Sequence, residues 1–335
     1  MKQLKKIAAG AALATALSGM GATAQDVSLR LGHWLPAAHP LHRDIEAWAA
    51  SLNTASEGSV SVQIFPAGQL GPAPDHYDLT ANGVADIAWV NPSYQPGRFP
   101  LAGITDIPFL IDDAAKGSAA LQEWYADYAP SEMGDVKTCI IHVGPPGTLH
   151  TQFELRSPDQ LSGVKVRPGS ATLARLVASL GGSSVQVPAP EAGQALARGV
   201  ADAITFPFNS LRLFGIDKSV SYHLDTPMYF ITAALVVNPA TYDRLNDTQK
   251  AAFDAHCTPE WSAKFAGSWI AWEEEGRLEM LQEGDRKFVS LSPDELSTWI
   301  EATRFLIDDW SNQASERGVD AEAALARFRA IYAAK

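Results

Sequence analysis

Cysteine is scarce in this sequence, which has only Cys139 and Cys257 among its 335 residues. Small secreted scaffolds that depend on disulfides carry several cysteines at short spacings. This chain therefore has to be held together mainly by its hydrophobic core. In an oxidising compartment the two cysteines are able to form one disulfide, but the sequence leaves open whether they are bonded or free.

Basic residues are also in the minority, with 26 Lys and Arg against 38 Asp and Glu and a formal net charge of −12. Nucleic acids and anionic lipids need a basic surface on their partner, so we expect neither of them to bind. In so acidic a protein, an anionic ligand would have to be held by local positive charge.

Several motifs of enzyme active sites are missing. The chain has no H-E-x-x-H, G-x-S-x-G, C-x-x-C, Walker or G-x-G-x-x-G motif. Only His33, His39 and His42 cluster among the eight histidines, and their spacing supplies no set of metal ligands. We therefore expect no enzymatic activity, no metal site and no cofactor.

The chain also lacks a run of 18 or more apolar residues after its N-terminal stretch, so nothing predicts a membrane anchor there. Residues 1–24 combine a basic start, an Ala-rich apolar segment and a final Ala-Thr-Ala, which is typical of a cleaved signal peptide. We expect export to the periplasm as a soluble protein. The mature chain would carry 23 basic and 38 acidic residues, a net charge of −15.

Strand and helix patterns occur twice in the same order, βαβαβ, which predicts two α/β lobes with parallel strands. The stretch Gly-Val-Ala-Asp closes both units, at 83–86 and 199–202. The first unit has expected strands at 27–31, 59–65 and 85–90 and helices at 40–52 and 75–81; the second has strands at 164–167, 185–187 and 201–206 and helices at 170–180 and from 190.

Further elements are expected to join the lobes into a two-lobed periplasmic binding protein fold, each lobe a βαβαβ-based sheet flanked by helices. Apolar strands at 137–143 and 231–237 would cross between the lobes. A long helix within 248–287, which Pro259 would interrupt or start, would span both. We expect a monomer. The predicted division is 25–144 with 234–275 for lobe I and 145–233 with 276–335 for lobe II, the C-terminal part partly wrapping lobe I.

Four segments follow strand ends and should face one another across the two lobes, because ligands of parallel sheets collect at the carboxyl ends of the strands. Arg167 is the candidate anchor, since a guanidinium matches a carboxylate through two parallel hydrogen bonds. Structural roles remain open for each residue: a surface ion pair for the arginine, core packing for the aromatics and turn chemistry for the asparagines. The candidate ligand-binding residues are Trp34, His39, Trp89, Asn91, Tyr94, Arg167, Phe206 and Asn209.

Several segments in order resemble the DctP-like solute-binding proteins of tripartite ATP-independent periplasmic (TRAP) transporters. They include Gly-Val-Lys-Val-Arg at 163–167, whose last residue is Arg167. The resemblance implies two lobes that close over an organic acid, a carboxylate bound by Arg167, and delivery to the membrane permease. The other matching segments are 65–71, 83–86, 97–101, 108–110, 161–162, 180–182, and 199–202 with Pro207.

Two departures from the family pattern bear on the ligand. Phe206 stands where the family often has an asparagine, and Gly147, Leu149 and His150 occupy the region where some members have a second basic residue. We therefore expect an aromatic or apolar monocarboxylate, similar to benzoate, and we include His150 among the binding residues. The alternatives are a small hydroxy or keto acid, a dicarboxylate, or a sensor role for the same fold; an enzyme is the less favoured option.

Overall fold

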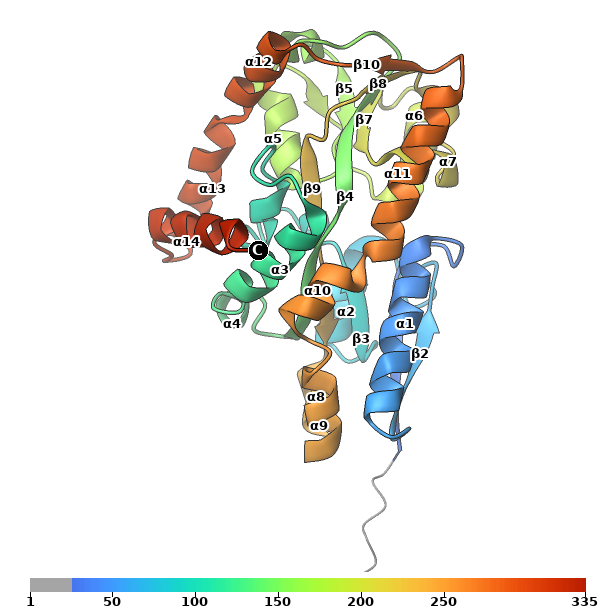
Figure 1. Ribbon diagram of the computed structural model, residues 1–335, viewed down its shortest axis with the longest axis vertical. Coiled ribbons are helices and arrows are strands. Elements are labelled where there is room, and N and C mark those ends of the chain that lie inside the picture. Colours follow the sequence, from blue (N-terminus) through green and yellow to red (C-terminus); the bar gives the residue numbers. More distant parts are fainter. Residues whose placement is uncertain (1–25) are drawn as a thin grey trace, which may run out of the picture.

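The structure is a computed structural model that describes residues 26–335. The signal peptide expected at 1–24 lies outside the described residues. Over the described range, no helix is both long enough and apolar enough to cross a membrane. The fold is α/β, with strands in the middle and helices around them (Figure 1).

The first βαβαβ unit forms where the sequence pattern predicts it. Its first helix begins at Pro40. The His39 side chain before it accepts a hydrogen bond from the backbone N–H of Leu41, one of the first N–H groups of the helix, which have no partner within the helix itself. The elements are β1 (Val27–Gly32), α1 (Pro40–Ala55), β2 (Val60–Phe65), η1 (Ala73–Asp75), α2 (His76–Ala81), β3 (Ile87–Val90), η2 (Pro92–Tyr94), η3 (Ala102–Asp106), α3 (Ala114–Tyr125) and α4 (Ala129–Glu132).

The second unit also forms, with one strand displaced. We predicted a strand at 185–187, but β6 covers the two residues before it, because alternation of apolar residues does not fix which residues pair. The Val187 carbonyl points to Arg167 instead. The elements are η4 (Pro158–Leu161), β5 (Lys165–Arg167), α5 (Ala171–Ser179), β6 (Ser183–Ser184), α6 (Ala189–Ala197), β7 (Ala203–Phe206), α7 (Phe208–Leu213), η5 (Asp217–Ser219) and β8 (Tyr222–Leu224).

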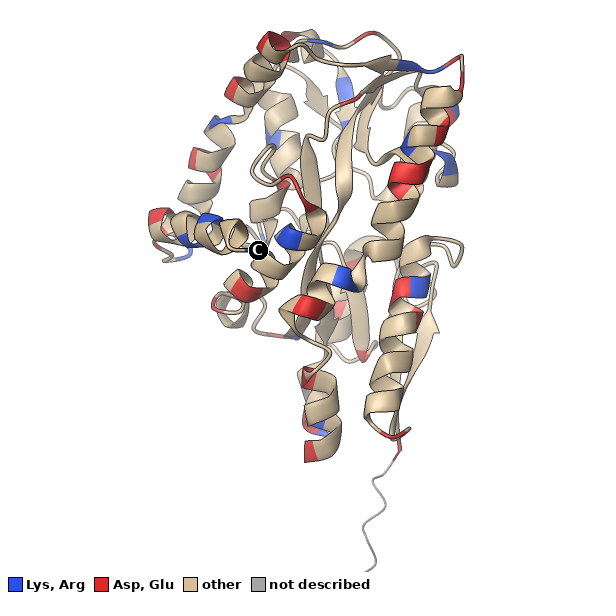
Figure 2. Cartoon of the chain, in the orientation of Figure 1, with Lys and Arg blue, Asp and Glu red and all other residues tan. Residues whose placement is uncertain are grey.

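Two long antiparallel strands, β4 (Lys137–Thr151) and β9 (Tyr229–Val237), connect the units. We expected the first strand to end at residue 143, before Gly-Pro-Pro-Gly, but β4 continues to Thr151. A shift in register between Val143 and Pro146 accommodates the prolines, as a β-bulge does. Neither strand carries a charged residue other than Lys137, and the charges lie mainly on the helices and loops around them (Figure 2).

Eight of the strands follow one another in the sheet in the order β2-β1-β3-β9-β4-β7-β5-β6, and β8 pairs with β4 off this path. Within each unit the first strand lies between the other two and pairs with both in parallel. The two units therefore share one topology, as the repeat predicted. The division of the chain into lobe I and lobe II that the sequence suggested remains a prediction.

The repeated Gly-Val-Ala-Asp stretch has the same structural role in both units. Each glycine has a positive φ, and each aspartate holds the basic residue of the central strand. Asp86 pairs with Arg30 of β1 at 2.9 Å, and Asp202 pairs with Lys165 of β5 at 3.3 Å. The motif thus ties the start of the third strand to the central strand in each unit.

The remaining helices enclose the sheet. We expected a long helix within 248–287 that Pro259 interrupts or starts. The chain forms three helices there, and one of them does start at Pro259, with the Thr258 side chain as its cap. α11 packs against both α1 and α7, so a helix does contact both units. The elements are α8 (Pro239–Asp243), α9 (Asp247–Asp254), α10 (Pro259–Phe265), α11 (Gly267–Gln282), β10 (Lys287–Val289), α12 (Pro293–Thr303), α13 (Phe305–Glu316) and α14 (Ala321–Ala333).

The C-terminal helices run along one side of the molecule, opposite α11 (Figure 1). β10, which the sequence did not predict, pairs with β8 in parallel. Cys139 of β4 and Cys257, just before α10, form a disulfide, which answers the question that the sequence left open.

Candidate ligand-binding site

Side chains from both units enclose a cavity beside the carboxyl ends of β1, β3, β5 and β7. About 410 Å³ of space between them is free of atoms, open solvent at the mouth included. This is the edge at which parallel strands present their loops to a ligand. The lining residues are Trp34, Leu35, His39, Asn91, Tyr94, Arg167, Gly169, Ala189, Phe206, Pro207, Ser210, Phe214, Tyr229, Ile231 and Trp269.

Arg167 is the one cationic side chain among these lining residues, and it is only 2% exposed. Its Nε donates a hydrogen bond to the Val187 carbonyl at 3.0 Å, and its guanidinium lies 5.5 Å from the centre of the Phe206 ring. No carboxylate of the described residues pairs with it. A buried charge without a counterion is expensive, so the arrangement favours an anion in the cavity.

The local sequence explains why Arg167 ends its strand there. Ser170 caps α5 by accepting a hydrogen bond from the Leu173 N–H, so the chain has to turn between Arg167 and Ser170. In that turn the Gly169 N–H donates to Thr205 Oγ1 at 2.7 Å. A Cβ at Gly169 would lie 2.9 Å from the hydroxyl of Tyr229, so only glycine fits there.

Aromatic rings form most of the remaining wall. Phe206 packs edge-on against Phe214 at 5.7 Å, and Trp34 lies 5.5 Å from Tyr94, measured between ring centres. The Tyr94 hydroxyl accepts a hydrogen bond from the Ala189 N–H at 3.0 Å. Burial raises the pKa of Tyr94, and the positive charge of Arg167 acts in the opposite direction. The hydroxyl therefore stays neutral beside the guanidinium.

Two further polar atoms at the cavity have no hydrogen-bond partner among the described residues: Trp34 Nε1 and His39 Nε2. An indole nitrogen can only donate. His39 Nδ1 accepts a hydrogen bond from the Leu41 N–H at 3.2 Å, and burial lowers the pKa of His39 to about 3. The neutral ring must then carry its proton on Nε2, so both unpaired atoms are donors.

Other buried histidines are neutral for the same reason. Burial lowers the pKa of His33 to about 3 and the pKa values of His142 and His223 to about 4. Two buried carboxyl groups are shifted the other way: burial raises the pKa of Asp106 to about 6 and that of Glu273 to about 7.

Glu273 of α11 organises one side of the cavity. Its carboxylate accepts hydrogen bonds from the Asn209 N–H at 2.6 Å, the Ser210 N–H at 3.0 Å and Trp269 Nε1 at 2.9 Å, and from the Ser210 hydroxyl. It thereby ties α11 to the start of α7. Ser210 and Trp269 line the cavity, so Glu273 fixes two of its walls without lining it.

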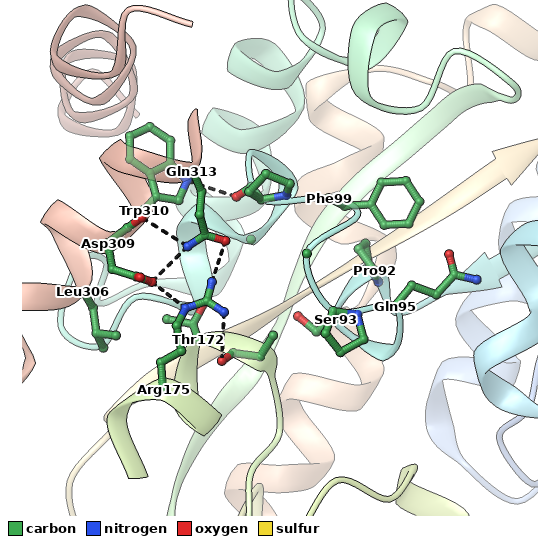
Figure 3. Close-up of a pocket in the computed structure, with 15 residues that line it drawn as sticks. Pro92, Ser93, Gln95, Phe99, Thr172, Arg175, Leu306, Asp309, Trp310 and Gln313 are labelled. Carbon is green, nitrogen blue, oxygen red and sulfur yellow. Dashed lines mark hydrogen bonds and ion pairs between the residues drawn. The ribbon is translucent and has the colours of Figure 1, made fainter. Parts of the chain in front are cut away.

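A separate hollow lies nearby, between the loop after β3 and the helices α5 and α13 (Figure 3). It also contains an arginine, Arg175, but this guanidinium is already paired with Asp309 and bonded to Gln313 Oε1 at 2.6 Å. Trp310 Nε1 donates to the Pro100 carbonyl at 3.0 Å. Because the charge is neutralised within the protein, this hollow does not call for an anion.

The structure brings six of the nine predicted residues to the cavity and places three elsewhere. Trp89 lies behind Trp34 and donates from Nε1 to His142. His150 holds the Phe206 carbonyl, and Asn209 Nδ2 donates to the Trp272 carbonyl across to α11. All three support the wall from behind because their polar atoms are bonded within the protein. The six at the cavity are Trp34, His39, Asn91, Tyr94, Arg167 and Phe206.

Sequence reasoning missed three aromatic residues of the lining, Phe214, Tyr229 and Trp269. We began the strand near Tyr229 two residues too late, at Ile231. Trp269 belongs to the apolar face that predicted a helix, but nothing in that pattern distinguishes a ring that faces a cavity from one that packs in a core.

Comparison with known proteins shows the family. The profile of the bacterial extracellular solute-binding proteins, family 7 (DctP), matches residues 31–313. A TRAP solute-binding protein from a marine metagenome, specific for aromatic acids and solved with 3-hydroxybenzoate, is 27% identical, with a TM-score of 0.85 over 92% of this chain and 99% of that chain.

A TRAP solute-binding protein of Bordetella bronchiseptica with bound mandelate is 28% identical, with the same TM-score of 0.85 over 92% of this chain and 99% of the other. A solute-binding protein of Roseobacter denitrificans is 25% identical over 266 residues, which is 77% of this chain and 80% of that protein. The chain therefore belongs to the bacterial extracellular solute-binding proteins of family 7 and is a TRAP solute-binding protein.

Proposed function

We propose that this protein captures an aromatic or apolar monocarboxylate, similar to benzoate, in the cavity around Arg167 and delivers it to a TRAP membrane permease. The observation that carries the proposal is a buried guanidinium that has no carboxylate partner within the described residues and faces a cavity walled by aromatic rings. The protein would work in the periplasm, as the extracytoplasmic family implies, and as a monomer.

The charge of the cavity favours a ligand with one carboxylate. Arg167 supplies the only positive charge of the lining, since His39 is neutral at physiological pH. A second carboxylate would enter without a counterion, and burying an unpaired charge is strongly unfavourable. C4 dicarboxylates such as succinate are therefore poor candidates.

The body of the ligand is inferred from the walls. Trp34, Tyr94, Phe206, Phe214 and Trp269 offer ring faces and edges, and aromatic pairs contribute about 0.5–1.5 kcal/mol beyond the burial of their area. A sugar acid would instead need many polar partners for its hydroxyl groups. Two structural relatives above 25% identity hold 3-hydroxybenzoate and mandelate, which supports an aromatic acid.

The test is a titration of the purified protein with benzoate, 3-hydroxybenzoate, mandelate, succinate, malate and glucuronate. Tryptophan fluorescence is a suitable signal, because Trp34 and Trp269 line the cavity. We expect the aromatic acids to bind at least tenfold more tightly than the others. Tightest binding of succinate, malate or glucuronate would refute the aromatic assignment.

A sensor that reports the same acid to a membrane receptor would have the same binding residues. Uptake of the bound acid in vesicles that contain the cognate permease would support transport, and a signalling response without uptake would support the sensor. Recovery of the acid unchanged after incubation would count against an enzyme.

A further inference from the structure

The cavity contains a pair of donors that Arg167 does not account for. Trp34 Nε1 and His39 Nε2 have no partner among the described residues, and both side chains are more than nine-tenths buried. A buried N–H without a partner loses its bond to water and gains nothing in return, which is unfavourable. Two such groups at one cavity indicate that a ligand supplies their acceptor.

The two donors come from the opposite unit to the guanidinium. Trp34 and His39 belong to the loop between β1 and α1, whereas Arg167 ends β5. A carboxylate held by the fork of Arg167 presents its own two oxygens to that side. Donors on the other unit are therefore available for a ligand atom that Arg167 does not contact.

The kind of ligand group that accepts from Trp34 and His39 can be inferred from which atoms at the cavity are unpaired. The side-chain atoms left buried and unpaired at the cavity, among residues 26–335, are these two donors, and no side-chain acceptor shares that status. A hydroxyl group accepts but also brings a proton that needs an acceptor of its own. A carbonyl oxygen has two lone pairs and no proton, so it satisfies both N–H groups and leaves nothing unpaired.

We propose that the ligand carries a keto oxygen beside its carboxylate, bound by Trp34 Nε1 and His39 Nε2, and that aromatic 2-oxo acids are the preferred class. This inference rests on the proposed function, because it assumes an acid held by Arg167 in the same cavity. Such a ligand bonds to both units at once, so it also stabilises the closed arrangement of the lobes.

Three acids that differ only at the second carbon test the proposal: phenylacetate with CH₂, mandelate with CHOH and phenylglyoxylate with C=O. Calorimetric titration of the wild-type protein should give the order phenylglyoxylate, mandelate, phenylacetate, with about a tenfold difference in Kd between the first and the last. Equal or tighter binding of phenylacetate would overturn the inference.

Two variants identify the donors. Trp34→Phe keeps a ring and removes the N–H, and His39→Asn keeps a side-chain acceptor that is able to cap α1 while removing Nε2. We expect each variant to weaken phenylglyoxylate about three- to tenfold more than it weakens phenylacetate, so that the ratio of the two Kd values falls. Trp48→Phe is the matched control, since the Trp48 N–H donates to the His256 carbonyl and does not line the cavity.

The outcomes separate this inference from the proposed function. If the variants weaken phenylacetate and phenylglyoxylate equally, the donors hold the carboxylate, and the keto assignment is wrong while carboxylate capture stands. If none of the three acids binds the wild-type protein but a dicarboxylate or sugar acid does, the proposed function itself fails.

Discussion

Replacing Arg167 should abolish tight binding while leaving the ligand-free protein nearly as stable as before. Arg167→Met is the informative variant, because methionine retains much of the apolar length and removes the charge. In the ligand-free protein the guanidinium bonds to the Val187 carbonyl and interacts with the Tyr94 hydroxyl, and it has no ion pair within the described residues. We therefore expect the free energy of unfolding to fall by no more than about 1 kcal/mol, because removal of the uncompensated buried charge offsets the lost hydrogen bond.

The effect on binding should be much larger. Two charge-assisted hydrogen bonds to a carboxylate contribute roughly 1.5–3 kcal/mol each, and their loss amounts to roughly 3–6 kcal/mol. At 25 °C this corresponds to a Kd for benzoate that is about 10²- to 10⁴-fold higher. Fluorescence or calorimetric titration measures the change, and thermal melts with and without benzoate show whether ligand stabilisation is lost.

Arg175→Met is the matched control. Arg175 lies in α5, the helix that follows β5. Its charge is paired with Asp309 in the hollow of Figure 3. This variant should keep the affinity for benzoate within about threefold, because Arg175 does not line the cavity and its charge is already paired within the protein. If Arg167→Met also kept its affinity within threefold, the assignment of Arg167 as the anchor would be wrong.

Three further predictions concern stability. Replacing Cys139 and Cys257 by serine should lower the free energy of unfolding by about 2–5 kcal/mol, measured by denaturant titration, because the bond closes a loop of 118 residues. Glu273→Ala should lower it by about 3 kcal/mol and weaken benzoate binding, because the amide and indole donors that it holds become unpaired; unchanged stability would contradict that role. Between pH 4.5 and pH 6.5 stability should rise with pH. The buried histidines, whose pKa values fall to about 3 or 4, bind protons only when unfolded, and they outnumber the two buried carboxyls that act in the opposite direction. Melts that grow less stable across this range would refute the assignment.

The position of Arg167 was predictable because its causes are local. A short apolar strand, a Pro-Gly turn and a serine cap set the end of β5, and the rule that parallel strands open their carboxyl ends to ligands brings the loops after β1, β3 and β7 to the same edge. The same reasoning placed Trp34, His39, Tyr94 and Phe206 at the cavity.

The rest depended on tertiary contacts that the sequence pattern does not encode. β4 continues past its two prolines because a shift in its register against β9 accommodates them. Trp269 reaches the cavity because α11 packs across both units, and Glu273 fixes it there. His150 and Asn209 were expected at the ligand, but their polar groups bond to Phe206 and Trp272, whose carbonyls lie nearby only in the folded chain.

A crystal structure of the protein with a bound aromatic acid would decide the matter. We predict that the carboxylate lies between the two units with both oxygens within about 3 Å of the Arg167 guanidinium, and with the ring against Phe206 and Trp34. A ligand bound outside this cavity, or one whose carboxylate contacts other residues while Arg167 stays unpaired, would contradict the proposal.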